Sequence, residues 1–154
     1  LFLDLVEKLP GVTARMICSP QDPTLHRAVK ERAAKIPTLE FLDGVPYREI
    51  QKHFDDARVF VNTSSDEGVP NTFLHSGLGG TAIVSLSCNP DGMISKFGAG
   101  TCADGDLDRF LNTAAELIKN PAALASAAAG ARSFVLAWHD NEKNVSAFLK
   151  GLPS

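Results

Sequence analysis

Ser64-Ser65-Asp66-Glu67-Gly68-Val69-Pro70-Asn71 joins a strand-like run at residues 58–62 to a helix-like run at residues 72–75. Gly68 tolerates backbone angles that a side chain would forbid, and Pro70 suits the first position of a helix, where its missing N–H costs nothing. The segment therefore predicts a strand, a tight turn and a helix that begins near Pro70.

The turn has the features of an anion site. The N–H groups of Asn71 and Thr72 would lack intrahelical acceptors, and with the positive end of the helix dipole they favour a phosphate or carboxylate ligand. Glu67 would flank such a ligand, and His75 would lie one turn along the helix on the face of Asn71. An ordinary strand-to-helix corner explains the same Gly and Pro equally well.

Composition and charge limit the class of protein. The 154 residues suit one domain spanning 1–154, and the apolar runs fall short of the ~20 residues that cross a bilayer. Fifteen basic and eighteen acidic side chains give 15 − 18 = −3, which argues against a nucleic-acid groove. Cys18, Cys88 and Cys102 have neither zinc nor disulfide spacing, and the histidines have no metal-ligand spacing. We expect a cytoplasmic globular protein.

Apolar runs that read as strands alternate with amphipathic runs that read as helices. The predicted strands are 13–18, 38–42, 59–61, 82–86 and, more weakly, 100–103. The predicted helices are 2–9, 25–36, 50–57, 70–79, 107–117, 124–135 and 145–152. This alternation predicts an α/β fold with a Rossmann-like parallel sheet, flanking helices and an all-helical final segment.

The sequence opens in a predicted helix, whereas a doubly wound unit normally begins with the strand that becomes central in its sheet. We therefore expect the chain to be part of a longer protein and its sheet to lack a middle strand. That strand would come from residues upstream of Leu1 or be replaced by a rearranged strand order.

Several motifs together resemble group 1 glycosyltransferases, glycosyltransferase family 4. The family signature S-x-x-E-G-x-P-N-x-x-L-E-A-M-A-x-G-x-P-V-V is matched at Ser64, Glu67, Gly68, Pro70, Asn71, Leu74, Gly80, Ile83 and Val84. Segments 41–46 and 91–100 are similar to the family's F-L-G-x-V-P and P-E-x-I…G-x-G stretches. The resemblance covers nearly the whole chain, with the motifs in the family's order.

The resemblance implies the C-terminal, donor-binding lobe of a two-lobed GT-B enzyme, a retaining hexosyltransferase with no metal and no cofactor. Its substrate would be a nucleotide-diphosphate sugar. Glu67 would be the catalytic residue and would contact hydroxyls of the donor sugar. The rest of the donor would be held by Gly68, Val69, Pro70, Asn71, Thr72, His75, Gly44, Val45 and Pro46, the last three beside the nucleobase.

The same resemblance places the acceptor, a glycan or a lipid-linked saccharide, on an N-terminal lobe that is missing from this sequence. The isolated lobe would then be inactive. The expected location is cytoplasmic, with peripheral contact at the cytoplasmic membrane face as an option for the full-length protein.

Three positions depart from the family pattern. His75 replaces the family's second Glu, which accepts hydrogen bonds from ribose; an imidazole either keeps that contact in weaker form or has a local partner on its helix face. Residues 18–20 replace a G-x-G-P loop, and the family's phosphate-binding Arg and Lys would lie upstream of Leu1. A non-catalytic nucleotide-binding or interaction domain, or a sugar-nucleotide epimerase, therefore stays open. Ser64 and Ser65 lack a His-Asp arrangement for nucleophilic catalysis.

Overall fold

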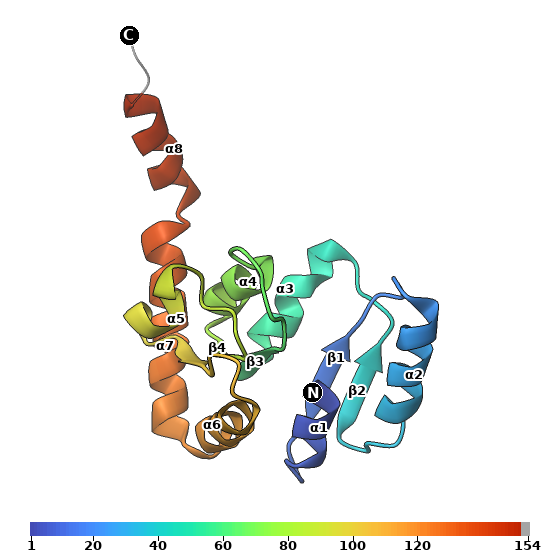
Figure 1. Ribbon diagram of the computed structural model, residues 1–154. Helices are drawn as coiled ribbons and strands as arrows, with labels where there is room; N and C mark the ends of the chain where they lie inside the picture. Colours follow the sequence, from blue (N-terminus) through green and yellow to red (C-terminus); the bar gives the residue numbers. More distant parts are fainter. Residues whose placement is uncertain (152–154) are drawn as a thin grey trace. The chain divides into compact units, whose positions relative to one another are not determined.

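The structure, a computed structural model, describes residues 1–151 and has the predicted α/β fold of parallel strands and flanking helices (Figure 1). The chain divides after Ile50 into two compact units, which we describe separately. The first unit is residues 1–50, and the second unit begins at Gln51. The organisation of residues 1–154 as one domain stays a prediction.

The first unit alternates helices with strands. Its elements are α1 (Phe2–Glu7), β1 (Ala14–Ile17), α2 (Pro23–Ala33), β2 (Leu39–Leu42) and the start of α3 (Tyr47–Asp55). β1 and β2 are parallel. The carboxylate of Asp22 caps α2 by accepting hydrogen bonds from the first N–H groups, so the chain turns sharply into this helix. The apolar faces of α1 and α2 pack on the strands through Leu3, Val6 and Ala33, and Ile36, just after α2, joins the same cluster.

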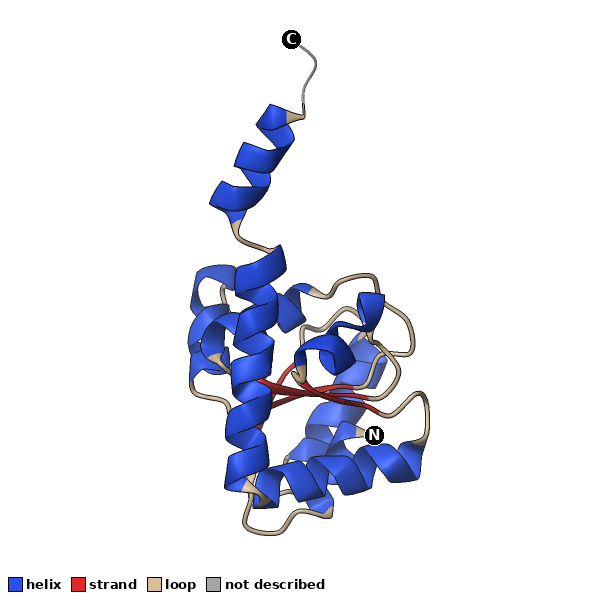
Figure 2. Ribbon diagram, turned by 90° about the vertical axis from the view of Figure 1, so that its left-hand side faces the viewer, coloured by secondary structure: helices blue, strands red, loops and turns tan. Residues whose placement is uncertain are grey.

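The second unit contains the sheet that carries the turn at residues 63–70. Its elements after α3 are β3 (Val59–Asn62), α4 (Asn71–Gly79), β4 (Ala82–Ser85), η1 (Pro90–Gly92), α5 (Met93–Phe97), β5 (Gly100–Cys102), α6 (Leu107–Lys119), α7 (Pro121–Trp138) and α8 (Asn141–Lys150). The strands lie in the order β3-β4-β5 and all run parallel, flanked by helices (Figure 2). Their carboxyl ends therefore meet at one edge.

β4 is the centre of the second unit. All four of its residues are at most 1% exposed, as expected for a central parallel strand that is covered on both faces. α7 packs on it through Ala131, Phe134 and Val135, which join Ile83 in one apolar cluster. Within the sheet, the neighbouring strand β5 approaches β4 closely at Gly100. Gly100 has φ +141°, and a Cβ atom there would stand 1.8 Å from the Ile83 carbonyl oxygen.

Several features differ from the sequence-based expectations. The strands form two hydrogen-bonded sheets, β1-β2 and β3-β4-β5, instead of one continuous sheet. The missing middle strand stays a prediction. α5 was not predicted, because five residues are too few to display a helical repeat. The last predicted helix is present as α8, but Leu152 lies outside the described residues. Among residues 1–151, none of the helices combines the length and hydropathy that a bilayer crossing requires.

Candidate functional site

The turn between β3 and α4 lies at the carboxyl edge of the three-stranded sheet. The last residues of the strands are aligned there, with Asn62 opposite Ser85 and Ser85 opposite Cys102. In open α/β sheets this edge is where ligands bind, because loops and helix N-termini converge on it. Residues 65–69 are all exposed, so the turn offers its groups to solvent.

Hydrogen bonds hold the first half of the turn. The Ser64 N–H donates to Asn62 Oδ1 over 2.9 Å, and the Ser64 hydroxyl donates to Glu67 Oε1. Asn62 is buried at 5% exposure, whereas the Glu67 side chain is exposed. The carboxylate of Glu67 is therefore tied at one oxygen to a turn that the buried end of β3 supports.

α4 begins one residue later than predicted. Pro70 has φ −65° and ψ 133°, an extended conformation, so it is the N-cap and not the first helical residue. Its carbonyl accepts from the Phe73 N–H over 2.9 Å, which closes the first helical turn. Asn71 and Thr72 are then the first two helical residues, whose N–H groups have no intrahelical acceptor. A helix N-terminus is therefore present where the sequence predicts one, and anion binding there stays a prediction.

Gly68 does not have the backbone conformation that we expected. It is absent from the glycines with positive φ, and a Cβ atom at this position would meet nothing within 4 Å. The fold itself therefore does not require glycine here. Because Gly68 has no side chain, the backbone of the turn is directly accessible from solvent at this position.

The predicted nucleobase loop belongs to the first unit. Gly44 has φ +143°, a conformation that L side chains rarely adopt, and it directly follows β2. Val45, between Gly44 and Pro46, is half-buried. The Pro46 carbonyl accepts from the Glu49 N–H over 2.8 Å at the start of α3. The loop is a well-defined strand-to-helix connection.

His75 has local partners on its helix face. Its Nδ1 lies 2.7 Å from the Gln51 side-chain oxygen, and the Gln51 amide donates to the His75 carbonyl over 3.2 Å. The imidazole also stacks on Phe54, with the ring centroids 5.5 Å apart and the planes 17° apart. Because Nδ1 must carry a proton to meet an oxygen, the other ring nitrogen is the acceptor in the neutral form. These contacts tie α4 to α3.

Comparison with known protein families shows to which family this chain belongs. The family model for glycosyl transferases group 1 matches residues 2–120, which includes both sheets and the Glu67 turn. This chain belongs to the group 1 glycosyltransferases. A search of curated proteins finds no match.

A solved structure has the same fold as this chain. It is a mutant of TarM from S. aureus, crystallised in complex with fondaparinux, alpha-GlcNAc-glycerol and UDP. The TM-score is 0.77 at 15% sequence identity, and the match covers 96% of this chain and 30% of the TarM chain. At this identity the likeness shows the fold of a GT-B lobe, and this chain spans less than a third of that protein's length.

Cys88 is a neighbour of the turn that sequence reasoning missed. Its Sγ donates to the Ser64 carbonyl over 3.4 Å, although the two residues are 24 positions apart and follow different strands. Burial, followed by the negative charge of Glu67, raises the pKa of the Cys88 thiol. No local pattern could have identified this contact. By contrast, the Ser64–Glu67 pair has the three-residue spacing of a local side-chain contact and was recognisable from the sequence.

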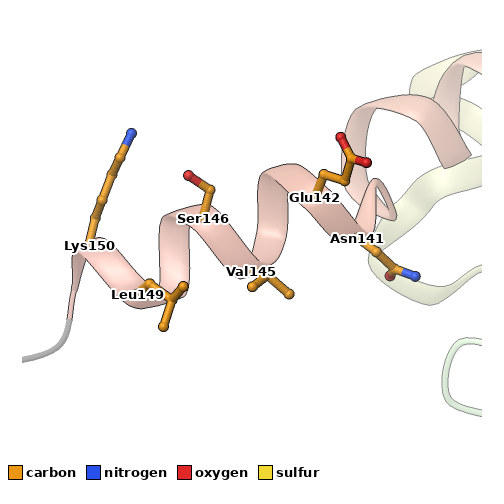
Figure 3. Close-up of a pocket in the computed structure, with 6 residues that line it drawn as sticks. All are labelled: Asn141, Glu142, Val145, Ser146, Leu149 and Lys150. Carbon is orange, nitrogen blue, oxygen red and sulfur yellow. The ribbon is translucent and has the colours of Figure 1, made fainter.

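The second unit has one hollow beside the turn and another along α8, away from the turn. One of about 390 Å³ is lined by Val69 of the turn and by Pro90, Asp91, Phe134, Ala137, Trp138, His139 and Asn144. A shallower one of about 660 Å³ follows one side of α8 and contains none of the predicted site residues (Figure 3). Within residues 1–151, no group of three or more His, Cys, Asp or Glu side chains could hold a metal ion.

Proposed function

We propose that this chain is the donor-binding lobe of a retaining glycosyltransferase, which transfers a sugar from a nucleotide-diphosphate sugar to a glycan or lipid-linked acceptor. One observation carries the proposal: an exposed carboxylate, Glu67, lies in the turn three residues before Pro70, the N-cap of α4, at the carboxyl end of the parallel sheet. That arrangement provides a hydrogen-bond acceptor for sugar hydroxyls beside donors for a diphosphate.

The helix tip would stabilise the leaving group. When the bond between sugar and diphosphate breaks, negative charge accumulates on the phosphate oxygens. The N–H groups of Asn71 and Thr72, with the helix dipole, are fixed donors that need no reorganisation as this charge develops. The bare backbone at Gly68 would let the diphosphate approach the turn closely. The proposal therefore requires no metal ion.

Glu67 would orient the donor sugar. Its Oε1 accepts the hydrogen bond from Ser64, and among the described residues no hydrogen bond reaches Oε2. A carboxylate oxygen has two lone pairs, so Oε2 can accept hydrogen bonds from hydroxyls of the sugar and orient the anomeric carbon, with the acceptor on the face from which the diphosphate leaves. The nucleobase would contact Gly44, Val45 and Pro46, and the leaving diphosphate would take the proton from the acceptor hydroxyl.

The TarM complex supports this class of ligands. That protein was crystallised with UDP and with saccharide-type molecules, and its likeness to this chain is at the level of the fold. The acceptor would bind to parts of the full-length protein outside this chain, so the isolated lobe would not transfer sugar. We keep the expected cytoplasmic location, with peripheral contact at the membrane face as part of the proposal.

A second candidate is a nucleotide-binding or interaction domain that keeps the fold without catalysis. The contacts of His75 favour it, since a ring that stacks on Phe54 and meets Gln51 already has a structural role in joining α3 to α4. In the preferred proposal, His75 would still contact the ribose.

Replacement of Glu67 in the full-length protein separates the two candidates. Release of nucleoside diphosphate from UDP-glucose, UDP-N-acetylglucosamine and GDP-mannose would be followed with a panel of glycan acceptors. We expect Glu67→Gln to lower kcat by about 100-fold or more, because one preorganised polar contact is worth that much in comparable sites. Asp66→Asn is the matched control, since it removes the neighbouring exposed carboxylate. Wild-type kcat in Glu67→Gln would refute the catalytic role.

Binding of nucleotide gives a second readout. Titration of the full-length protein with UDP and GDP should perturb the amide resonances of Asn71 and Thr72, because those N–H groups would donate to phosphate oxygens. Binding without any detectable transfer by the wild type would favour the non-catalytic domain. Unperturbed amides at saturating nucleotide would contradict both the donor-binding lobe and a nucleotide-binding domain, and would favour an interaction domain.

A further inference from the structure

Ser64 is the point where contacts from two strand ends and from Glu67 converge. Its N–H donates to Asn62 Oδ1 over 2.9 Å, and its carbonyl accepts from Cys88 Sγ over 3.4 Å. Its hydroxyl donates to Glu67 Oε1. The main chain of Ser64 is therefore held from both sides while its side chain holds the carboxylate.

The two residues that hold the main chain of Ser64 are both buried. Asn62 is the last residue of β3 and is 5% exposed, and Cys88 follows β4 and is 4% exposed. β3 and β4 are hydrogen-bonded neighbours, with Asn62 opposite Ser85. The support for Ser64 thus comes from buried residues at and just after the carboxyl ends of β3 and β4, and not from the exposed loop itself.

Glu67 needs such support. It is exposed, and apart from Ser64 no described side chain forms a hydrogen bond or an ion pair with its carboxylate. A glutamate in this situation loses much rotamer freedom when it is fixed, so an unheld carboxylate would sample many positions. A hydrogen bond to one oxygen selects an orientation and leaves the other oxygen for a ligand.

We infer that Ser64 is the positioning residue of Glu67, anchored to the sheet by Asn62 and Cys88, and that it presents Glu67 Oε2 to the donor sugar. The inference rests on the proposed function for its catalytic consequence. It goes beyond that function because it assigns a role to a serine and a buried cysteine to which the proposed function gives none. Misplacement of a reacting group by about 1 Å can cost roughly 100-fold in rate, which is the effect that Ser64 would prevent.

The test uses kcat and donor KM of the full-length protein with the best donor from the panel above. We expect Ser64→Ala to lower kcat roughly 10- to 100-fold, with the affinity for UDP changed less than about twofold, because the diphosphate contacts remain. Ser64→Thr should restore most of kcat, since it keeps the hydroxyl. Cys88→Ala should lower kcat more than Cys88→Ser, which retains a donor. Ser65→Ala is the matched control, an exposed neighbouring hydroxyl.

A spectroscopic readout separates this inference from the proposed function. The carboxyl ¹³C resonance of Glu67 should shift in Ser64→Ala and return toward the wild-type position in Ser64→Thr, whether or not the protein transfers sugar. An unmoved resonance with wild-type kcat in Ser64→Ala would overturn the inference while Glu67→Gln still tests the function. Loss of kcat together with a lowered Tm, without rescue by Ser64→Thr, would show that Ser64 serves folding only. That result would also overturn the inference.

Discussion

The three cysteines show how much the surroundings of one residue determine its chemistry. Cys88 and Cys102 are 4% and 7% exposed, and burial raises the pKa of both thiols. Cys18 follows β1 and is half-buried. Because the thiolate is the reactive form and must be reached by the reagent, the three thiols should differ in reactivity.

We predict that iodoacetamide at neutral pH modifies Cys18 at least about tenfold faster than Cys88 or Cys102, since both of the latter are shielded and held as thiols. Mass spectrometry of peptides after short exposure would measure the three rates. In guanidinium chloride the rates should converge. Faster modification of Cys88 than of Cys18 in the folded protein would mean that the loop after β4 opens readily and does not provide a rigid support.

At the scale of elements, the contact between α4 and α7 depends on a glycine. A Cβ atom on Gly77 would stand 2.3 Å from Val135 Cγ2 and 2.6 Å from the Ala131 carbonyl oxygen. The two helices therefore pack with their backbones closer than any side chain allows. α4 carries the open N-terminus of the candidate site, so this packing also positions the site.

Replacement of Gly77 by alanine should destabilise the protein, although this change inside a helix normally stabilises it by up to about 1 kcal/mol. We expect a net loss of about 1–3 kcal/mol, since α7 must move to admit the methyl group. Chemical denaturation of the full-length protein would measure the loss. Ser126→Ala, on the exposed side of α7, is the control and should be neutral or slightly stabilising. A stabilised Gly77→Ala would show that the helices pack less closely than described.

At the scale of the whole molecule, the chain consists of two units with unequal cores. In the second unit β4 is buried throughout and is hydrogen-bonded to β3 on one side and to β5 on the other. In the first unit β1 and β2 have only each other, and each has one exposed residue and three half-buried ones. The candidate site residues from Glu67 to His75 belong to the better-buried unit.

We predict that backbone amides of β4 exchange with deuterium more slowly than those of β1 and β2, because exchange from a buried central strand requires large-scale opening. Hydrogen exchange of the full-length protein, resolved by mass spectrometry or NMR, would measure the difference. The loop at residues 65–69, which is exposed, serves as the fast reference. Equal protection of the two sheets would indicate that both units open together.

Local signals were sufficient for the fold class and the family. The alternation of apolar runs, the Gly-Pro turn and the order of motifs all lie within short stretches, where residue spacing follows the geometry of helices and strands. They predicted the parallel strands, the helix after Pro70 and the membership of the group 1 glycosyltransferases, which the family match confirms.

Tertiary structure decided the details that depend on residues distant in sequence. It made Pro70 the cap of α4 and not its first residue, and it divided the strands into two sheets. It also gave His75 its partners and brought Cys88 to the backbone of Ser64, both across 24 positions. The sequence by itself determined most of the helices and strands, with α5 and η1 as exceptions, and it selected the Glu67 turn as the candidate site. Only the packing of the sheets and helices determined what supports that turn, because contacts between elements that are distant in sequence produce no regular spacing of residue types.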